Sequence, residues 1–274
     1  MINISLRIFW LFLDILIALM HHLFNKASTS ISRLQSCCTS LSQSGSNRTR
    51  NPSGERQVYQ STKMELYLKA GPQGTSVGDC PFAHYVRCVL HFKGLECKVL
   101  PCTAETKPAW LINECSGKMP CLRIDGFTIT ESGEIIKYIE KTYTEPSLTV
   151  PNLNEAMQIQ ANMFLPMAKF LKSKEFDEGK ENDLITELNK LNEHFGKNKY
   201  LAGDSLSLAD YSLGPKLYHL DIAVDHFYPD TRKKIKNTCE NLENYMTLIF
   251  EDSSLEATKY PHDVVIWGWT NARK

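Results

Sequence analysis

The sequence has no excess of charge of either sign, no long hydrophobic run and no paired-cysteine motif. Its 274 residues carry 31 basic and 31 acidic side chains. A nucleic-acid-binding chain needs a basic surface, so this balance argues against DNA or RNA as a partner. No CxxC pair occurs and no Cys/His spacing suits zinc, so we expect no metal site. Nine cysteines are too few for a disulfide scaffold in a chain of this length, which indicates a reducing compartment.

Residues 1–63 differ in composition from the rest of the chain. They hold seven basic residues, two acidic residues and 11 serines, which predicts a mostly unfolded or targeting extension. Its apolar run, residues 8–20, is interrupted by Asp14 and is shorter than the roughly 20 residues that cross a bilayer. Four interpretations stay open: a secretory signal, an organelle transit peptide, a membrane-associated tail, or translation that starts at Met64.

The remaining residues divide into two parts with different patterns. Residues 64–146 predict a compact α/β domain in the order βαβαββα, because alternating apolar residues and helical stripes succeed one another between Gly and Pro turns. The expected strands are 65–69, 95–100, 119–124 and 127–129, and the expected helices are 81–93, 107–114 and 132–143. Residues 147–274 predict an all-helical domain, with helices near 155–171, 181–195, 208–227, 232–250 and 255–259.

Cys80 is the candidate nucleophile. It directly precedes a predicted helix that begins at Pro81, where a missing N–H costs nothing. Its sulfur should face the free N–H groups of the first helical turn, so we expect an exposed thiol with a lowered pKa. The fourth residue of the motif is Ala83, so this motif has no resolving cysteine and a thiol co-substrate must remove any adduct.

Three further local patterns surround this expectation. Pro120 follows Met119 at the entry to a strand, where a cis bond can present the Met119 backbone to an extended peptide ligand. Glu131 and Ser132 begin a helix, which indicates either a carboxylate-binding N-terminus or an ordinary N-cap. Residues 207–210 (SLAD) predict a capping box with a structural role.

Together these residues resemble the glutathione transferase superfamily, in which a thioredoxin-like domain binds glutathione. The resemblance covers about residues 65–269. Within the superfamily the sequence most resembles the glutathione-dependent dehydroascorbate reductases. It resembles the chloride intracellular channel proteins second. The segments that carry this similarity are 69–71 (KAG), 78–82 (GDCPF), 107–110 (KPAW), 117–120 (GKMP), 215–219 (PKLYH) and 264–269 (VVIWGW). Ala83 departs from the pattern, since both families commonly have Ser or Cys there.

The resemblance implies a role for each site residue. Cys80 is the nucleophile. The residues implied to contact dehydroascorbate or ascorbate are Lys69, Asp79, His219 and Trp269. The residues implied to hold glutathione, a co-substrate, are Lys107, Met119, Pro120, Glu131 and Ser132. Lys107 would pair with the glycine carboxylate of glutathione, Met119 with its cysteinyl backbone and Ser132 with its γ-glutamyl carboxylate.

The expected function is therefore glutathione-dependent reduction of dehydroascorbate. Two alternatives remain: a membrane-inserting protein of the channel type, and a non-catalytic glutathione-binding redox sensor. We expect the catalytic core to act as a monomer in the cytoplasm, with residues 1–63 as the source of any organelle, secretory or membrane targeting.

Overall fold

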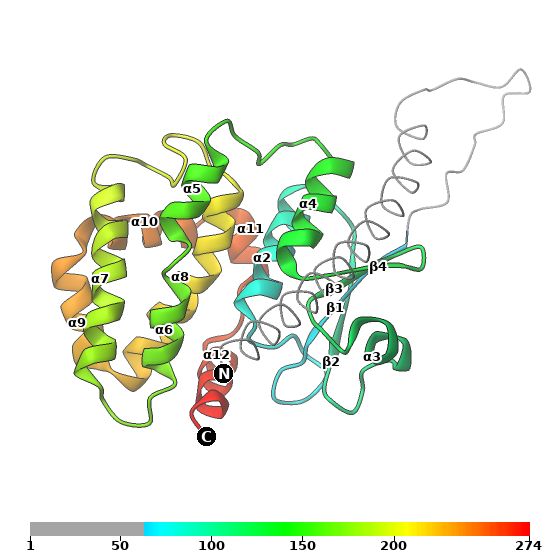
Figure 1. Ribbon diagram of the computed structural model, residues 1–274, viewed down its shortest axis with the longest axis horizontal. Helices are drawn as coiled ribbons and strands as arrows, with labels where there is room; N and C mark the ends of the chain where they lie inside the picture. The colour runs from blue at the N-terminus through cyan, green and yellow to red at the C-terminus, as the bar shows by residue number, and fades with distance from the viewer. Residues whose placement is uncertain (1–62) are drawn as a thin grey trace, which may run out of the picture. The chain divides into compact units, whose positions relative to one another are not determined.

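The structure is a computed structural model that describes residues 63–274. The apolar run at residues 8–20, and with it the expected extension, lies outside the described residues. Within them, the first part holds a four-stranded sheet with three helices, and the second part is all helical (Figure 1). This is the predicted fold class, a thioredoxin-like domain followed by a helical domain.

The sheet has the strand order β2-β1-β3-β4, with β1 parallel to β2 and antiparallel to β3. The elements of this part are β1 Met64–Lys69, α2 Pro81–Phe92, β2 Lys98–Cys102, α3 Ala109–Cys115, β3 Cys121–Ile124, β4 Phe127–Thr130 and α4 Ser132–Thr142. Helices α2 and α4 lie on one side of the sheet and α3 lies on the other (Figure 1). The carboxyl end of β1 leads through a loop to the start of α2, and this placement creates the site described below.

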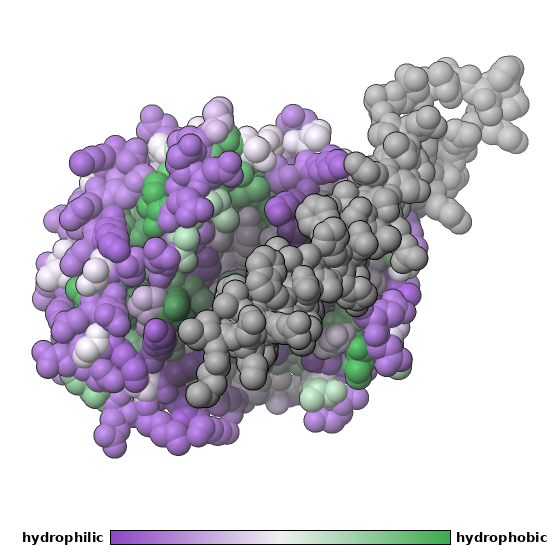
Figure 2. All heavy atoms as spheres, in the orientation of Figure 1, coloured by the Kyte–Doolittle hydropathy of each residue, from purple (hydrophilic) through white to green (hydrophobic). Residues whose placement is uncertain are grey.

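The helical part is built around α8, Leu208–Phe227, most of whose residues are buried. Residues on all sides of α8 are buried because it packs against α2 of the first part as well as against its helical neighbours. The other helices are α5 Leu153–Gln160, α6 Phe164–Leu171, α7 Glu178–Phe195, α9 Pro229–Thr238, α10 Glu240–Phe250, α11 Ser253–Thr258 and α12 His262–Ala272. Polar residues cover most of the visible face of this part, with hydrophobic residues in small groups (Figure 2).

Two helix predictions for this part were wrong in detail, and one helix was not predicted. The single helix expected at 155–171 is two helices, because Pro166 has no N–H to donate to the carbonyl four residues earlier. The helix expected at 232–250 is also two, which meet at the buried, non-helical Cys239. The last helix, α12, was not predicted. Its β-branched residues, two tryptophans and Gly268 have weak helix propensity, and packing against α8 overrides that preference.

The capping box at residues 207–210 is confirmed. The Asp210 carboxylate accepts hydrogen bonds from Ser207 N at 2.9 Å and Ser207 Oγ at 2.8 Å. It also accepts from Leu201 N at 2.9 Å and from the Tyr245 hydroxyl at 3.0 Å. Burial raises the pKa of Asp210, while these four hydrogen bonds oppose the shift. The residue therefore anchors α8 to its surroundings.

Candidate active site at Cys80

Cys80 occupies the N-cap position of α2, directly before Pro81. Its backbone is extended, and its carbonyl accepts the first helical hydrogen bond from His84 N at 3.0 Å. The same carbonyl accepts a hydrogen bond from the Tyr260 hydroxyl at 3.0 Å. Tyr260 belongs to the connection between α11 and α12, so both parts of the molecule fix the position of this cysteine.

Gly78 brings Cys80 to the end of β1. Its N–H donates to the Lys69 carbonyl at 2.8 Å, and an added Cβ would lie 2.6 Å from that oxygen and 2.7 Å from the Ala70 oxygen. Only glycine permits so close a backbone approach without displacement. The loop therefore closes tightly, and Asp79 and Cys80 follow at the carboxyl end of the strand.

The expected direction of the Cys80 pKa was wrong. Cys80 is half-buried rather than exposed, and burial raises the pKa of its thiol above the usual value. The backbone N–H groups of Ala83 and Phe82 oppose this rise, as helix geometry predicts, and the Lys69 charge also lowers the pKa. Asp79 adds to the rise. Desolvation outweighs the helix terminus, so in the free protein the thiol is the main form at neutral pH.

Two pockets meet at Cys80. The larger, of about 770 Å³, extends along the loop after β1, the end of β2 and the segment before β3. The smaller, of about 230 Å³, lies between the start of α2 and the helical part. Cys80 and Lys69 line both pockets. A sulfur at such a junction can contact one ligand on the sheet side and another on the helical side.

The larger pocket contains part of the expected glutathione site. Lys107 and Met119 line it, and Lys107 Nζ donates to the Gly117 carbonyl at 2.8 Å. The Met119–Pro120 peptide bond is cis, as the sequence suggested. Pro120 itself is buried. This side offers the Lys107 cation and the segment before β3, at Met119, to a peptide-like ligand.

Glu131 and Ser132 do not line either of these pockets. They lie at the start of α4, where Glu131 has a φ of 69° and pairs with Lys118 at 3.0 Å across an exposed surface. Ser132 is the first residue of the helix and is half-buried. The structure places this pair at a helix N-terminus, as expected, and leaves its contact with glutathione a prediction.

The smaller pocket brings together the residues expected to contact dehydroascorbate. Lys69, Asp79, His219 and Trp269 all line it. Lys69 Nζ lies 2.6 Å from Asp79 Oδ1, and the lysine also lies 5.2 Å from the ring of Trp267. Asp79 is mostly buried while Lys69 remains 46% exposed, so solvent screens this ion pair from one side.

Gly268 allows Asp79 to approach α12. An added Cβ at this position would overlap the Asp79 carboxylate. The glycine is interior to a helix, where it costs stability relative to alanine, and the close contact explains its presence. Gly268 and Trp267 were not predicted as site residues. Both residues lie in the segment 264–269, which resembles the family. They reach the site only because this segment forms α12, a helix that its residue propensities do not predict.

His219 is buried in α8 and held by Trp269. The Trp269 indole N–H donates to His219 Nδ1 at 3.2 Å. Burial lowers the His219 pKa to about 3, and the Lys69 charge adds to the shift, so the ring is neutral at neutral pH. A neutral imidazole that accepts at Nδ1 carries its proton at Nε2. That Nε2–H has no hydrogen-bond partner among residues 63–274, which leaves one donor free in a residue that lines the pocket.

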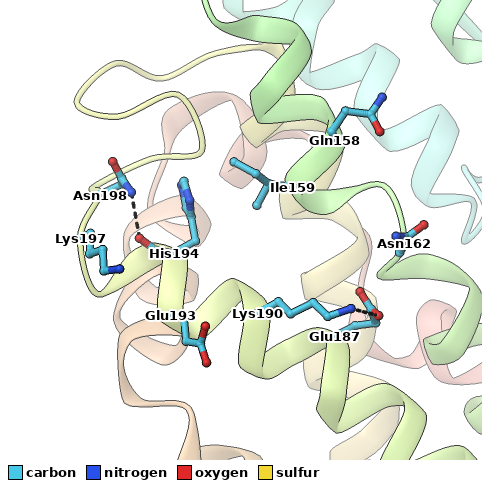
Figure 3. Close-up of a pocket in the computed structure, with 9 residues that line it drawn as sticks. All are labelled: Gln158, Ile159, Asn162, Glu187, Lys190, Glu193, His194, Lys197 and Asn198. Atoms are coloured by element: carbon cyan, nitrogen blue, oxygen red, sulfur yellow. Dashed lines mark hydrogen bonds and ion pairs between the residues drawn. The ribbon is translucent and has the colours of Figure 1, made fainter.

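A third hollow, of about 450 Å³, is unrelated to this site. It lies between α5 and α7 of the helical part, and Figure 3 shows Lys190 paired with Glu187 in it. None of the residues predicted from the sequence lines this hollow.

Among residues 63–274 there is no group of three or more His, Cys, Asp or Glu side chains placed to hold a metal ion. Over the same residues no helix is long and apolar enough to span a membrane.

Comparison with known proteins identifies the class to which this fold and site belong. Residues 75–147 match the family model of the glutathione S-transferase N-terminal domain, and residues 179–247 match that of the C-terminal domain. The chain belongs to the glutathione S-transferase family.

Within this family the chain is similar to dehydroascorbate reductases. It is 33% identical over 196 residues to glutathione S-transferase DHAR2 of Arabidopsis thaliana, covering 70% of this chain and 90% of that protein. It is 34% identical over 210 residues to the probable cytosolic glutathione S-transferase DHAR1 of Oryza sativa subsp. japonica, covering 75% and 96%. The crystal structure of Chlamydomonas reinhardtii dehydroascorbate reductase superposes with a TM-score of 0.62 at 26% identity, covering 77% and 98%.

Proposed function

We propose that this protein reduces dehydroascorbate to ascorbate, with two molecules of glutathione as the reductant and Cys80 as the nucleophile. The observation that carries the proposal is the position of Cys80 at the junction of two pockets. One pocket presents Lys107 and Met119 to a peptide-like ligand, and the other presents a cation and a neutral imidazole to a small oxidised one. The names of the dehydroascorbate reductases to which the chain is similar support the same substrate.

The first step forms a bond between Cys80 and the substrate. The thiolate attacks a carbonyl carbon of dehydroascorbate, and the carbonyl oxygen becomes an alkoxide. Lys69 and His219 line the pocket in which this charge develops. Lys69 can stabilise the charge electrostatically, and His219 has an unpartnered Nε2–H with which to donate a hydrogen bond. His219 cannot supply this donor as an imidazolium at neutral pH, because burial holds its pKa near 3.

The next steps consume glutathione. The sulfur of the first glutathione attacks Cys80 Sγ, the carbon–sulfur bond breaks, and its electron pair leaves with ascorbate, which takes up a proton. This leaves a disulfide between Cys80 and glutathione. A second glutathione thiolate attacks the glutathione sulfur of that disulfide, which restores the Cys80 thiolate and releases oxidised glutathione. Cys80 needs no resolving cysteine in its own motif for this cycle.

Binding of glutathione in the larger pocket follows from its charges and backbone groups. We assign Lys107 to the glycine carboxylate, the Met119 backbone beside cis-Pro120 to the cysteinyl residue, and the start of α4 at Glu131 and Ser132 to the γ-glutamyl end. A glutathione transferase from rice solved with glutathione has the same fold at 15% identity. The requirement for reduced thiols favours a reducing compartment, and the relatives include proteins described as cytosolic and as chloroplastic.

The test is glutathione-dependent formation of ascorbate by the full chain, followed by ascorbate absorbance after subtraction of the uncatalysed reaction. We expect turnover in the parent, its loss in Cys80→Ser, and its retention in Cys97→Ser, a half-buried cysteine that lines neither pocket. No turnover in a folded parent would reject the reductase function. If Cys80 still forms a disulfide with glutathione in that case, the redox-sensor alternative takes its place.

A further inference from the structure

We propose that Cys115 and Cys121 form a second redox site, a dithiol that oxidised glutathione converts into an intramolecular disulfide beside the glutathione pocket. Neither residue lines the two pockets at Cys80. Both are free thiols in the structure. The proposal concerns a modification site that the Cys80 cycle does not use.

The fold brings the two thiols to one face of the sheet. Cys121 is the first residue of β3, where it lies opposite Tyr67 of β1 and Thr130 of β4. Thr128, two residues before Thr130, is the diagonal neighbour of Cys121 on that face. Cys115, the last residue of α3, donates from its Sγ to the Thr128 hydroxyl at 3.7 Å. Its sulfur therefore lies over the position next to Cys121.

Helix α3 encloses the pair in a small apolar cluster. Cys115 and Cys121 pack with Tyr67, Leu111 and Trp110, apart from the main core. The Trp110 ring lies edge-on to Tyr67, with ring centroids 5.0 Å apart, and holds α3 on the sheet. A sulfur in this cluster has the other thiol among its near neighbours, which is the arrangement that favours an intramolecular disulfide over reaction with solvent thiols.

The two cysteines differ in accessibility, and this sets the order of reaction. Cys115 is half-buried, whereas Cys121 has no exposed surface. Burial raises the pKa of Cys121 to about 12, and the neighbouring Cys115 thiol adds to the rise. Because the thiolate is the attacking species, the first attack on an external disulfide falls to Cys115.

The chemistry balances with oxidised glutathione as the only oxidant. The Cys115 thiolate attacks one sulfur of oxidised glutathione, which forms a mixed disulfide and releases one reduced glutathione. The Cys121 thiolate then attacks Cys115 Sγ, which forms the protein disulfide and releases the second reduced glutathione. Two protein thiols are oxidised, one glutathione disulfide is reduced, and the two thiol protons pass to the departing glutathione thiolates.

The disulfide would act on the glutathione site through the turn that it closes. Residues 116–120 join the two cysteines and include Gly117, whose carbonyl holds Lys107, and Met119, which lines the pocket. This consequence rests on the proposed function, in which the turn holds glutathione and oxidised glutathione is the product. Accumulated product would then oxidise the turn and weaken binding of the reduced co-substrate.

The experiment equilibrates the full chain in mixtures of reduced and oxidised glutathione, blocks free thiols by alkylation, and maps disulfides in tryptic peptides without reduction. Lys118 lies between the two cysteines, so trypsin separates them unless a disulfide joins their peptides. We expect the joined peptide, with loss of both free thiols, in the parent and in Cys80→Ser. Cys121→Ser should stop at a mixed disulfide between Cys115 and glutathione, and Cys115→Ser should leave Cys121 unmodified.

Persistence of both free thiols, or pairing of Cys115 with Cys80 or Cys102, would overturn the proposed disulfide. The test does not depend on dehydroascorbate turnover, so its failure is distinguishable from failure of the proposed function. Glutathione binding by calorimetry tests the regulatory consequence: we expect several-fold weaker binding to the oxidised protein in a Cys80→Ser background. Equal affinity of the two redox forms for glutathione would overturn the proposal that the disulfide weakens glutathione binding.

Discussion

The Trp269 indole N–H donates to His219 Nδ1 at 3.2 Å, and this bond fixes which ring nitrogen of His219 carries the proton. The free donor at Nε2 then belongs to a residue in the wall of the smaller pocket. The last helix of the chain thereby sets the hydrogen-bonding character of a residue in the central helix α8.

His219 should contribute as a neutral hydrogen-bond donor. We expect His219→Leu to raise KM for dehydroascorbate and lower kcat/KM by roughly tenfold, about the value of one hydrogen bond. His219→Gln keeps an N–H donor, so its kcat/KM should fall less than that of His219→Leu. The exposed His226 on the same helix provides the control variant His226→Gln, which should leave both constants unchanged. A rate profile with a His219 limb near pH 6–7 would contradict the neutral ring that its pKa of about 3 implies.

The raised pKa of Cys80 predicts the pH dependence of its reactivity. Only the thiolate reacts, and the thiol dominates below a pKa that burial holds above the usual value. The rate of Cys80 alkylation in the free protein should therefore still rise with pH above pH 7, because the thiolate fraction is still increasing there. Measurement uses iodoacetamide and peptide mapping, with Cys80→Ser as the blank. A plateau reached below pH 7 would show a preformed thiolate instead.

Gly268→Ala should disturb the site through Asp79. The added methyl group overlaps the Asp79 carboxylate, so either α12 or the Lys69–Asp79 ion pair must move. We expect a loss of about 1–3 kcal/mol in the free energy of unfolding, together with reduced dehydroascorbate turnover. Gly179→Ala provides the matched control, because a Cβ there makes only an ordinary contact with Asp177 at the start of α7. Denaturant unfolding that shows equal stability for the two variants would contradict the close contact.

Lys107→Gln should raise the KM for glutathione and leave the KM for dehydroascorbate unchanged. Removal of the charge that we assign to the glycine carboxylate should raise KM for glutathione roughly ten- to hundredfold, as expected for a charged hydrogen bond. Lys137→Gln changes a lysine on the exposed face of α4 that pairs with Glu134, and should change neither KM. The assignment fails if the Lys107 variant raises KM for dehydroascorbate instead.

Part of this architecture could be predicted because local residues determine it. Pro81 favours the start of a helix whatever that helix packs against, and Asp125-Gly126 forms the turn of the hairpin between β3 and β4. The capping box at Ser207 is likewise local. Cys80 followed as the candidate nucleophile from its place before Pro81.

Other features depend on contacts that residue patterns do not contain. The Cys80 pKa rises because burial of the thiol outweighs the helix terminus, and the residues next to Cys80 in the sequence indicate only the helix terminus. Helix α12 forms against α8 in spite of weak propensity, so Trp267 and Gly268 were missed. The proximity of Cys115 to Cys121 requires α3 to fold back over the sheet.

The central claim is that Cys80 sulfur carries the electrons from glutathione to dehydroascorbate. The direct test mixes the protein with dehydroascorbate and one equivalent of glutathione, quenches with acid, and measures ascorbate and the state of each cysteine by peptide mapping. The account predicts one ascorbate released for each glutathione disulfide formed at Cys80, and no ascorbate above the uncatalysed rate in Cys80→Ser. Ascorbate released while Cys80 remains a free thiol, or a glutathione disulfide at another cysteine in its place, would contradict the account.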